Sequence, residues 1–313
     1  MRRSSLAIAS LCSHVARGDS KPLEPREWSV LEGRLRAVNA EASELFSFSS
    51  GDFCDRLNMT EQESVRLLKL LDRAPELLSV LERYGRYGVH IVTRADEEYP
   101  GPLLSKLGGS SPPVFYFAGS LELLGRPAIG VVGSRNAGAE ALDIAKQVAA
   151  RLADTGYALV SGGARGVDRA AEDAAAGLGG SVVEFLSDSL LRRLERDETG
   201  GLLNGGRVLL LTAAHPDAGF SAGLAMMRNR YIHALGTATV AIETSLGRGG
   251  TWAGCIDNIK HRWSRLYCWD NGSSGNAALI ARGAIPLTQE TLKTFPPPQA
   301  PEPDERYEQT SLF

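Results

Sequence analysis

The chain has 313 residues, of which 43% are hydrophobic and 23% charged, and its formal net charge is −3. This composition excludes a collagen, a coiled coil, a wholly disordered chain and a uniformly basic nucleic-acid coat. The length suits one large or two ordinary domains, and any site for a polyanion must be a local basic patch.

The N-terminal residues 1–24 are predicted to be either a disordered segment or a first helix. The apolar stretch Leu6–Cys12 follows two arginines and resembles a signal peptide only faintly, because it is short and lacks a cleavage site. No apolar run approaches the ~18 residues that a membrane span needs. The four cysteines lie far apart without zinc-ligand or redox spacing, which predicts reduced thiols in a cytoplasmic protein.

Residues 25–92 are predicted to form a small helical module. Apolar residues recur at helical spacing between Leu31 and Leu81. Thr60 and Glu63 have the spacing of a capping box, which predicts that a helix begins at about residue 61.

Residues 93–290 are predicted to form a Rossmann-like α/β domain. The proline-rich residues 89–126 favour a connector with two short extended pieces. From Pro127 onward, short apolar strands alternate with alanine-rich helices, which is typical of a parallel sheet covered on both faces. The predicted strands are Ala128–Val132, Tyr157–Val160, Ser181–Leu186, Val208–Thr212, Thr239–Glu243 and Leu266–Trp269, and the clearest helices are Ala139–Leu152 and Ala222–Leu235. Residues 291–313 are predicted to be a flexible, proline-rich and acidic tail.

Three of the predicted strands are each followed by a glycine-rich segment that holds an arginine and precedes a helix. Ligands of open parallel sheets bind at the carboxyl ends of the strands. Glycine lets the backbone approach a ligand, helix N-termini offer free N–H groups, and arginine adds a bidentate phosphate donor. The pattern therefore predicts a phosphate-binding rim, although tight turns with solvated arginines are the structural alternative. The expected rim residues are Gly133, Ser134, Arg135, Ser161, Gly162, Gly163, Arg165, Gly166, Arg248, Gly249, Gly250 and Thr251.

The helix before the fifth strand carries Arg228, Asn229 and Arg230, which we add to the candidate site. The two arginines lie about 200° apart on a helix, so we expect one to point at the rim and the other to brace a loop or face a partner. Cations outnumber acids between residues 228 and 265, and aromatic residues are interleaved with them. Such a pattern suits a single nucleic-acid strand, although these aromatics could equally belong to the core. They are Trp252, Trp263 and Tyr267.

The sequence contains no supported catalytic constellation. Asp168 stands where it would cap the helix after its loop. The dinucleotide fingerprint G-x-G-x-x-G is absent, which argues against NAD chemistry. We expect no catalytic residue, no metal and no other cofactor.

Several motifs of this chain are similar to those of the DprA/Smf family, in matching order and spacing from about residue 85 to 287. The preceding helices resemble that family's SAM-like module more weakly. The resemblance implies an extended Rossmann fold that binds single-stranded DNA, usually as a homodimer, and that helps load the RecA recombinase during natural transformation. It also implies that the DNA pocket contains Ser134, Arg135, Gly162, Arg165, Arg228, Asn229, Arg230 and Arg248. The motifs are Tyr99–Pro100, Pro112–Tyr116, Val131–Arg135, Ser161–Asp168, Arg228–Arg230 and Gly275–Ala284.

The last five residues resemble the bacterial sliding-clamp peptide Q-L-[SD]-L-F. Gln309, Ser311, Leu312 and Phe313 match this pattern, and Thr310 departs from it. Sliding-clamp docking through these four residues and an inert tail are the two alternatives.

The sequence thus favours a non-enzymatic protein that binds single-stranded DNA in uptake, recombination or repair. One alternative is a sensor of a small nucleotide. Another is a nucleotide N-glycosidase of the LOG type, whose P-G-G-x-G-T-x-x-E motif is echoed by Gly249–Thr251. Ala253 and Gly254 stand where that motif needs its glutamate, which argues against hydrolysis.

Overall fold

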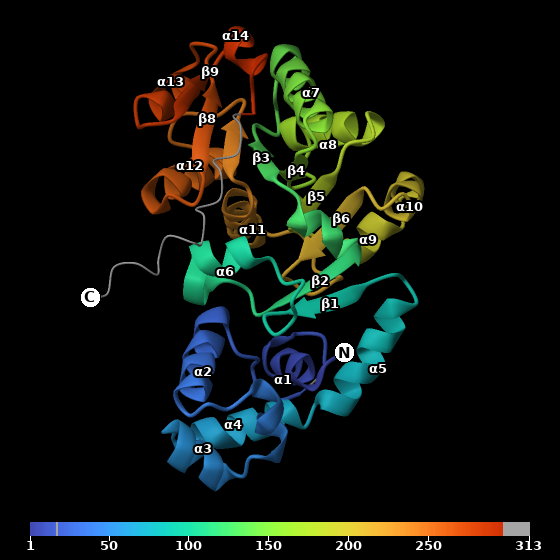
Figure 1. Ribbon diagram of the computed structural model, residues 1–313, viewed down its shortest axis with the longest axis vertical. Coiled ribbons are helices and arrows are strands. Elements are labelled where there is room, and N and C mark those ends of the chain that lie inside the picture. The colour runs from blue at the N-terminus through green and yellow to red at the C-terminus, as the bar shows by residue number, and fades with distance from the viewer. Residues whose placement is uncertain (17, 297–313) are drawn as a thin grey trace, which may run out of the picture.

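The computed structural model describes residues 1–16 and 18–296. A helical module packs against one end of a nine-stranded sheet, and the remaining helices cover the two faces of that sheet (Figure 1).

The helical module contains α1 to α5. Thr60 Oγ1 accepts from the backbone N–H of Glu63 at 3.2 Å, and Glu63 Oε2 accepts from that of Thr60 at 2.8 Å. This capping box confirms the predicted helix start, because helix α4 begins at the next residue. The helices are α1 (Arg3–Cys12), α2 (Pro25–Ala37), α3 (Ser50–Leu57), α4 (Glu61–Leu71) and α5 (Ala74–Gly85), with a 3₁₀ turn over Ala42–Ser47.

Within residues 1–24, the structure shows a packed helix rather than a disordered segment. Helix α1 buries Ile8 and Leu11 almost completely. The buried Arg73 guanidinium donates to the carbonyls of Ser10, Ser13 and Ala16. It thereby satisfies carbonyl groups that the end of a helix leaves without partners.

The sheet has the order β1-β2-β6-β5-β4-β3-β7-β8-β9. Strands β3 to β9 run parallel to one another, and β2 pairs antiparallel with both of its neighbours, β1 and β6. Strand β3 lies between β4 and β7, so the direction of strand addition reverses between β3 and β7. This is the topological switch point at which such sheets bind ligands. The strands are β1 (His90–Thr93), β2 (Val114–Gly119), β3 (Ala128–Val132), β4 (Ala158–Ser161), β5 (Val182–Phe185), β6 (Val208–Thr212), β7 (Ala238–Ala241), β8 (Arg265–Trp269) and β9 (Ile285–Leu287).

The prediction that residues 89–126 form a connector is wrong in one respect. The two extended pieces are β1 and β2, and β2 pairs antiparallel with β6. They belong to the same sheet as the Rossmann-like strands, because pairing covers the edge that β6 would otherwise expose. A boundary at residue 92/93 would cut through β1.

Helices pack on both faces of the sheet, which confirms the predicted α/β class. In β6, Val208 and Leu210 point into one core, and Leu209 and Leu211 point into the other. The first core also contains residues of the helical module, α7 and α8, and the second contains residues of α6, α11 and α12. The remaining helices are α6 (Gly101–Leu107), α7 (Ala139–Asp154), α8 (Val167–Gly177), α9 (Leu190–Leu194), α10 (Asp197–Asn204), α11 (Ala222–Leu235), α12 (Gly249–His261), α13 (Ser274–Ile280) and α14 (Gln289–Leu292).

All four cysteines are free thiols. Among the described residues, no helix has both the length and the apolar character to span a membrane.

Candidate functional site

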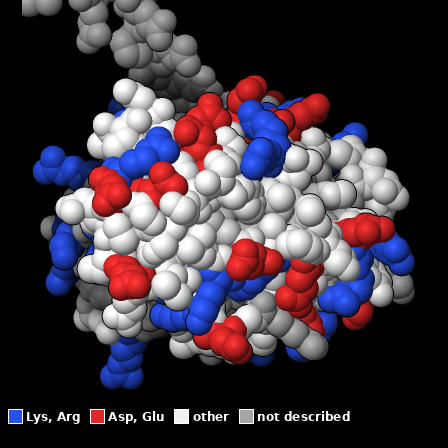
Figure 2. Space-filling model, turned by 90° about the horizontal axis from the view of Figure 1, so that it is seen from below, with Lys and Arg blue, Asp and Glu red and all other residues white. Residues whose placement is uncertain are grey.

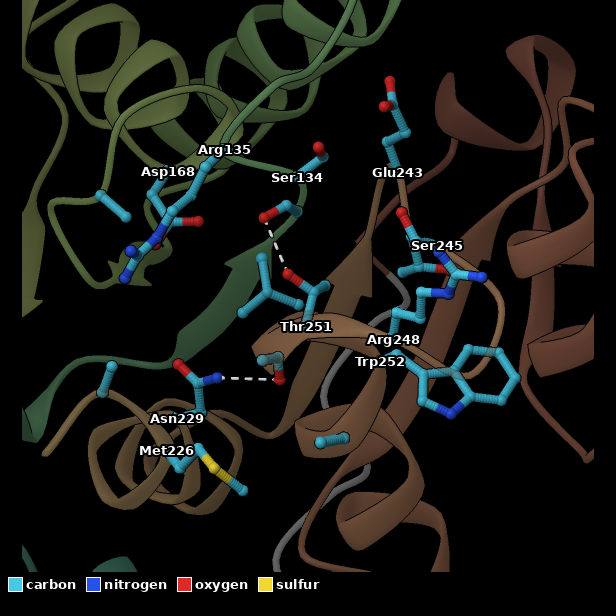
Figure 3. Close-up of a pocket in the computed structure, with 18 of the residues that line it drawn as sticks. Ser134, Arg135, Asp168, Met226, Asn229, Glu243, Ser245, Arg248, Thr251 and Trp252 are labelled. Atoms are coloured by element: carbon cyan, nitrogen blue, oxygen red, sulfur yellow. Dashed lines mark hydrogen bonds between the residues drawn. The ribbon is translucent and has the colours of Figure 1, made fainter. Parts of the chain in front are cut away.

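A cavity of about 610 Å³ opens at the switch point, between the segments that follow β3 and β7. Figure 3 shows Ser134 and Arg135 on one side of it and Ser245, Arg248 and Trp252 on the other. Helix α11 provides a third wall. The cavity lies where three of the predicted rim segments and the Arg228–Arg230 helix were expected to converge.

Two hydrogen bonds hold the glycine-rich segment that follows β7, which contains Arg248–Thr251 (Figure 3). Thr251 Oγ1 donates to the carbonyl of Gly133 at 2.8 Å, and Asn229 Nδ2 donates to that of Gly250 at 3.1 Å. The first bond joins the β7 segment to the β3 segment, and the second joins it to α11. Thr251 and Asn229 therefore position the backbone that faces the cavity.

The second glycine-rich segment lines an adjoining recess of about 280 Å³, with Arg135 and Phe220 in the walls of both. A Cβ at Gly162 would lie 1.1 Å from Arg228 Nη1, so only glycine leaves room for that guanidinium. Gly166 has φ +90°, and a Cβ there would lie 2.3 Å from the Ser134 carbonyl oxygen. Both glycines permit close packing of the rim segments.

Ser161 does not reach the rim. It is fully buried and donates through Oγ to the carbonyl of Val131 at 2.7 Å. The Ser161 hydroxyl thus points toward the neighbouring strand rather than into the cavity, and its hydrogen bond joins the end of β4 to β3.

Arg228 and Asp168 both line the cavity and form a buried ion pair there, with Nη1 and Oδ2 3.3 Å apart. The prediction that Asp168 caps its helix is wrong: Gly166 occupies the N-cap position of α8. The Asp168 carboxylate instead accepts from the backbone N–H groups of Gly133 and Ala164, and burial raises its pKa. Asp168 thus joins two rim segments to α11.

Arg230 is placed away from the cavity. Its side chain is about half exposed, and its Nε lies 3.9 Å from Asp257 Oδ2 on α12. The expectation that the two arginines of this helix point in different directions agrees with this geometry.

Three rim arginines are exposed to solvent and carry no ion pair among the described residues: Arg135, Arg165 and Arg248. The Arg135 guanidinium lies 4.8 Å from the centroid of the Phe220 ring. Arg165 Nη2 donates to Asn136 Oδ1 at 2.6 Å. Within the described part of the chain no carboxylate neutralises these cations, so they are available to an anionic ligand.

The interleaved aromatics do not form one surface. Trp252 lines the cavity, and the Arg282 guanidinium lies 5.4 Å from its ring centroid. Trp263 is buried and stacks on His261, and Tyr267 packs edge-on against Phe295. Helix α12 and strand β8 turn these side chains in different directions.

Sequence reasoning missed the roles of three residues. Phe220 is 55% exposed and lines both recesses, and an exposed aromatic just before a helix could have indicated it. Glu243 follows β7 and lines the cavity. Asn276 is fully buried and holds the β7 segment: its Oδ1 accepts from the backbone N–H and the hydroxyl of Thr244, both at 3.0 Å.

The clamp-like residues Gln309, Ser311, Leu312 and Phe313 lie outside the described residues. In the part of the chain that is described, no group of three His, Cys, Asp or Glu side chains could hold a metal ion. The end of the molecule formed by the helical module shows acidic and basic side chains interspersed around neutral surface, without a continuous basic face (Figure 2).

One family model matches most of the Rossmann-like part of the chain. The family model described as DNA recombination-mediator protein A matches residues 90–293. A protein of Mycobacterium tuberculosis, named a candidate DNA processing protein DprA in two strains, is 28% identical over 215 residues. These residues make up 60% of this chain and 52% of that protein, so the chain spans about half the length of the curated relatives it matches.

Solved structures with a similar fold include two DNA processing proteins. DNA processing protein A of Streptococcus pneumoniae superposes with a TM-score of 0.69 at 20% identity, over 93% of this chain and 96% of that one. DNA processing protein A of Helicobacter pylori, described with its single-stranded DNA binding mode, gives a TM-score of 0.52 at 21% identity, over 65% and 94% of the two chains.

Proposed function

This chain belongs to the DNA recombination-mediator protein A family, because that family's model covers residues 90–293, and we propose that it is a cytoplasmic protein that binds single-stranded DNA at the rim of its sheet. One observation carries the proposal. Exposed arginines that form no ion pair with any described residue surround a cavity at the switch point, on segments whose backbones are held by buried side chains. They are Arg135, Arg165 and Arg248.

The geometry suits phosphates and bases together. Helices α8 and α12 begin at the rim, so their free N–H groups and positive dipole ends add to the arginine charge. Phe220 and Trp252 offer aromatic surface beside those cations. A phosphate track with neighbouring aromatic rings is the usual basis for binding single strands with little sequence preference.

A binding role is favoured over catalysis. Ala253 lines the cavity close to where the LOG motif would place a catalytic glutamate. Glu243 also lines the cavity, but its Oε2 lies 3.4 Å from the backbone nitrogen of Gly138, a contact that fits a loop-bracing role. Release of free base from a nucleoside monophosphate would contradict this reading.

The direct test is fluorescence anisotropy with labelled dT oligomers of increasing length at two salt concentrations. Replacing Arg135 and Arg248 together by alanine is expected to weaken binding at least about tenfold and to lower the log–log salt slope by roughly two, since two phosphate contacts are lost. Arg26→Ala plus Arg83→Ala is the matched control, because both arginines are exposed on the helical module. Equal effects of the two pairs would refute the site.

The second candidate is a sensor of a small nucleotide. A cavity of about 610 Å³ lies within the range of about 300–1,000 Å³ that is typical of small-ligand pockets. In the same titration, full displacement of the oligomer by a mononucleotide and no dependence on oligomer length would favour this function.

Three partners also belong to the proposal: a RecA-type recombinase, a second copy of this chain, and the sliding clamp. Support for clamp docking comes from the sequence of residues 309–313 alone. Phe313→Ala is expected to abolish binding of a purified bacterial clamp in surface plasmon resonance while single-strand binding is retained. Unchanged clamp binding would leave the tail without this role.

A further inference from the structure

The edge of the sheet opposite the rim carries a second group of cations. Strands β3, β7 and β8 are neighbours, and backbone hydrogen bonds join their amino ends: the N–H of Thr237 donates to the carbonyl of Ala128, and that of Arg265 donates to the carbonyl of Thr237. Lys106 Nζ of α6 donates to the carbonyl of Gly236, the residue before Thr237, at 2.9 Å. We call the cations at these strand ends and at the end of α12 the amino-edge patch. They are Lys106, Arg126, Lys260, Arg262 and Arg265.

No ion pair with a described residue neutralises the amino-edge patch. Four of its members are exposed, and burial lowers the pKa of Lys106 to about 8, so that this amine is still mainly protonated at neutral pH. Two acids, Glu122 and Asp257, lie within four residues of these cations along the chain, and Asp257 Oδ2 already lies 3.9 Å from Arg230 Nε. The patch therefore has a surplus of positive charge, although the whole chain has a net charge of −3.

The described chain ends beside this patch. Phe295 packs edge-on against Tyr267 of β8, with ring centroids 5.1 Å apart, and its carbonyl accepts from Arg151 Nε at 3.3 Å. Arg265 precedes Tyr267 by two residues, so both side chains point to the same face of β8, about 7 Å apart along the strand. Pro296, the last described residue, directly follows Phe295, so the chain leaves the described structure next to Arg265.

The sequence beyond Pro296 has the complementary charge. Residues 302–308, which we call the acidic segment, contain four acids and one arginine: Glu302, Asp304, Glu305, Glu308 and Arg306. Glu302 is the sixth residue after Pro296, and six residues extend to at most about 20 Å. Neighbouring strands are about 4.8 Å apart, so the amino ends of β8, β7 and β3 all lie within reach of this segment.

We infer that the acidic segment docks on the amino-edge patch of its own chain. A single exposed ion pair contributes little, but the short tether gives the segment an effective concentration at the patch on the order of millimolar. Several weak ion pairs with a tethered partner are then enough for docking. The docking site is at the edge opposite the rim, so the inference does not depend on the function proposed above.

Paramagnetic relaxation NMR of the full chain tests this inference. A nitroxide is attached at Thr310→Cys in a Cys54→Ser background, because the other three cysteines are buried. The nitroxide is expected to broaden the backbone amide resonances of Arg126 and Thr237 more than that of Ser134 on the rim. Salt screens exposed charges, so this broadening should decrease as salt is added.

The pair Arg262→Ala plus Arg265→Ala is expected to lower the ratio of docked to free segment about 2- to 10-fold, the usual effect of losing two exposed ion pairs. Arg26→Ala plus Arg83→Ala, at exposed positions of the helical module, is the matched control and should leave the broadening unchanged. Neutralising the four acids should remove the excess broadening at the patch. These changes are Glu302→Gln, Asp304→Asn, Glu305→Gln and Glu308→Gln. Equal broadening at the patch with the acidic and the neutralised segment, or stronger broadening at the rim than at the patch, would overturn the inference.

Discussion

At the scale of single residues, the rim depends on a cluster of buried charges beneath the second glycine-rich segment. Glu172 Oε1 accepts from the backbone N–H of Gly163 at 2.8 Å, while Oε2 has no hydrogen-bond partner among the described residues. Burial, together with the carboxylates of Glu184 and Asp168, raises the pKa of Glu172 well above its usual 4.5, against the attraction of Arg169. The segment that carries Gly162 and Gly163 is thus held by a group that binds a proton more tightly in the folded state.

This residue predicts a pH dependence of stability. Because the pKa is raised on folding, its stabilising contribution is fully present below about pH 4.5 and is lost as the pH rises through the raised value. Glu172→Gln is expected to raise the melting temperature at pH 8 by roughly 2–4 °C, the effect of about 1 kcal/mol. It should have less effect at pH 5. Calorimetric scans of the wild type and of Glu172→Gln at both pH values measure this difference in melting temperature. An increase at pH 8 no larger than that at pH 5, or a decrease at pH 8, would refute the prediction. Glu140→Gln, exposed on α7, is the control.

At the scale of elements, the β7 segment is held from behind by α13. Asn276 accepts from Thr244 through Oδ1 and donates through Nδ2 to the carbonyls of Ile242 and Trp269, both at 2.8 Å. A Cβ at the preceding Gly275 would lie 2.1 Å from the Thr244 carbonyl oxygen, so α13 approaches this backbone closely. One side chain therefore fixes β7, β8 and the start of a rim segment together.

Asn276→Ala is expected to cost about 2–4 kcal/mol of unfolding free energy, because it leaves several buried polar groups unpaired. It should also weaken DNA binding at temperatures where the variant is still folded, since the segment before Arg248 loses its support. Urea unfolding and anisotropy measure the two effects. Asn204→Ala, exposed at the end of α10, is the control, and stability within about 0.5 kcal/mol of the wild type for both variants would contradict the role of Asn276.

The elements also show what the sequence could predict. Strands β3 and β6 have the predicted bounds, because strands buried on both faces read as continuous apolar runs. The sequence also predicted that the glycine-rich segments lie near one another, because the carboxyl ends of parallel strands are at the same edge of a sheet. Pairing of β2 with β6 could not be read from local pattern, because its partner lies far along the chain. The sequence also could not predict which way the Arg228 side chain points, since its ion-pair partner Asp168 is 60 residues away.

At the scale of the whole molecule, the helical module and the sheet share a core. Helices α1 and α5 contact β1, and α1 also contacts β2. Leu11 of α1 is fully buried in the cluster that also contains Ile129 of β3. The module therefore covers one face of the sheet at its β1 end, and its removal would expose that face to water.

This shared core predicts that the chain unfolds in one transition. Leu11→Ala is expected to cost about 2–5 kcal/mol, because it opens a cavity in the core, and to shift all probes together. Trp28 is in the module, whereas Trp252, Trp263 and Trp269 belong to the Rossmann-like domain. Tryptophan fluorescence of the Trp28→Phe protein therefore follows that domain alone, while far-ultraviolet circular dichroism follows both parts. In urea the two midpoints should coincide with and without Leu11→Ala, and Val30→Ala, at a position 57% exposed, should change neither. A separate, earlier transition in circular dichroism would instead show a module that folds independently of the DNA-binding rim.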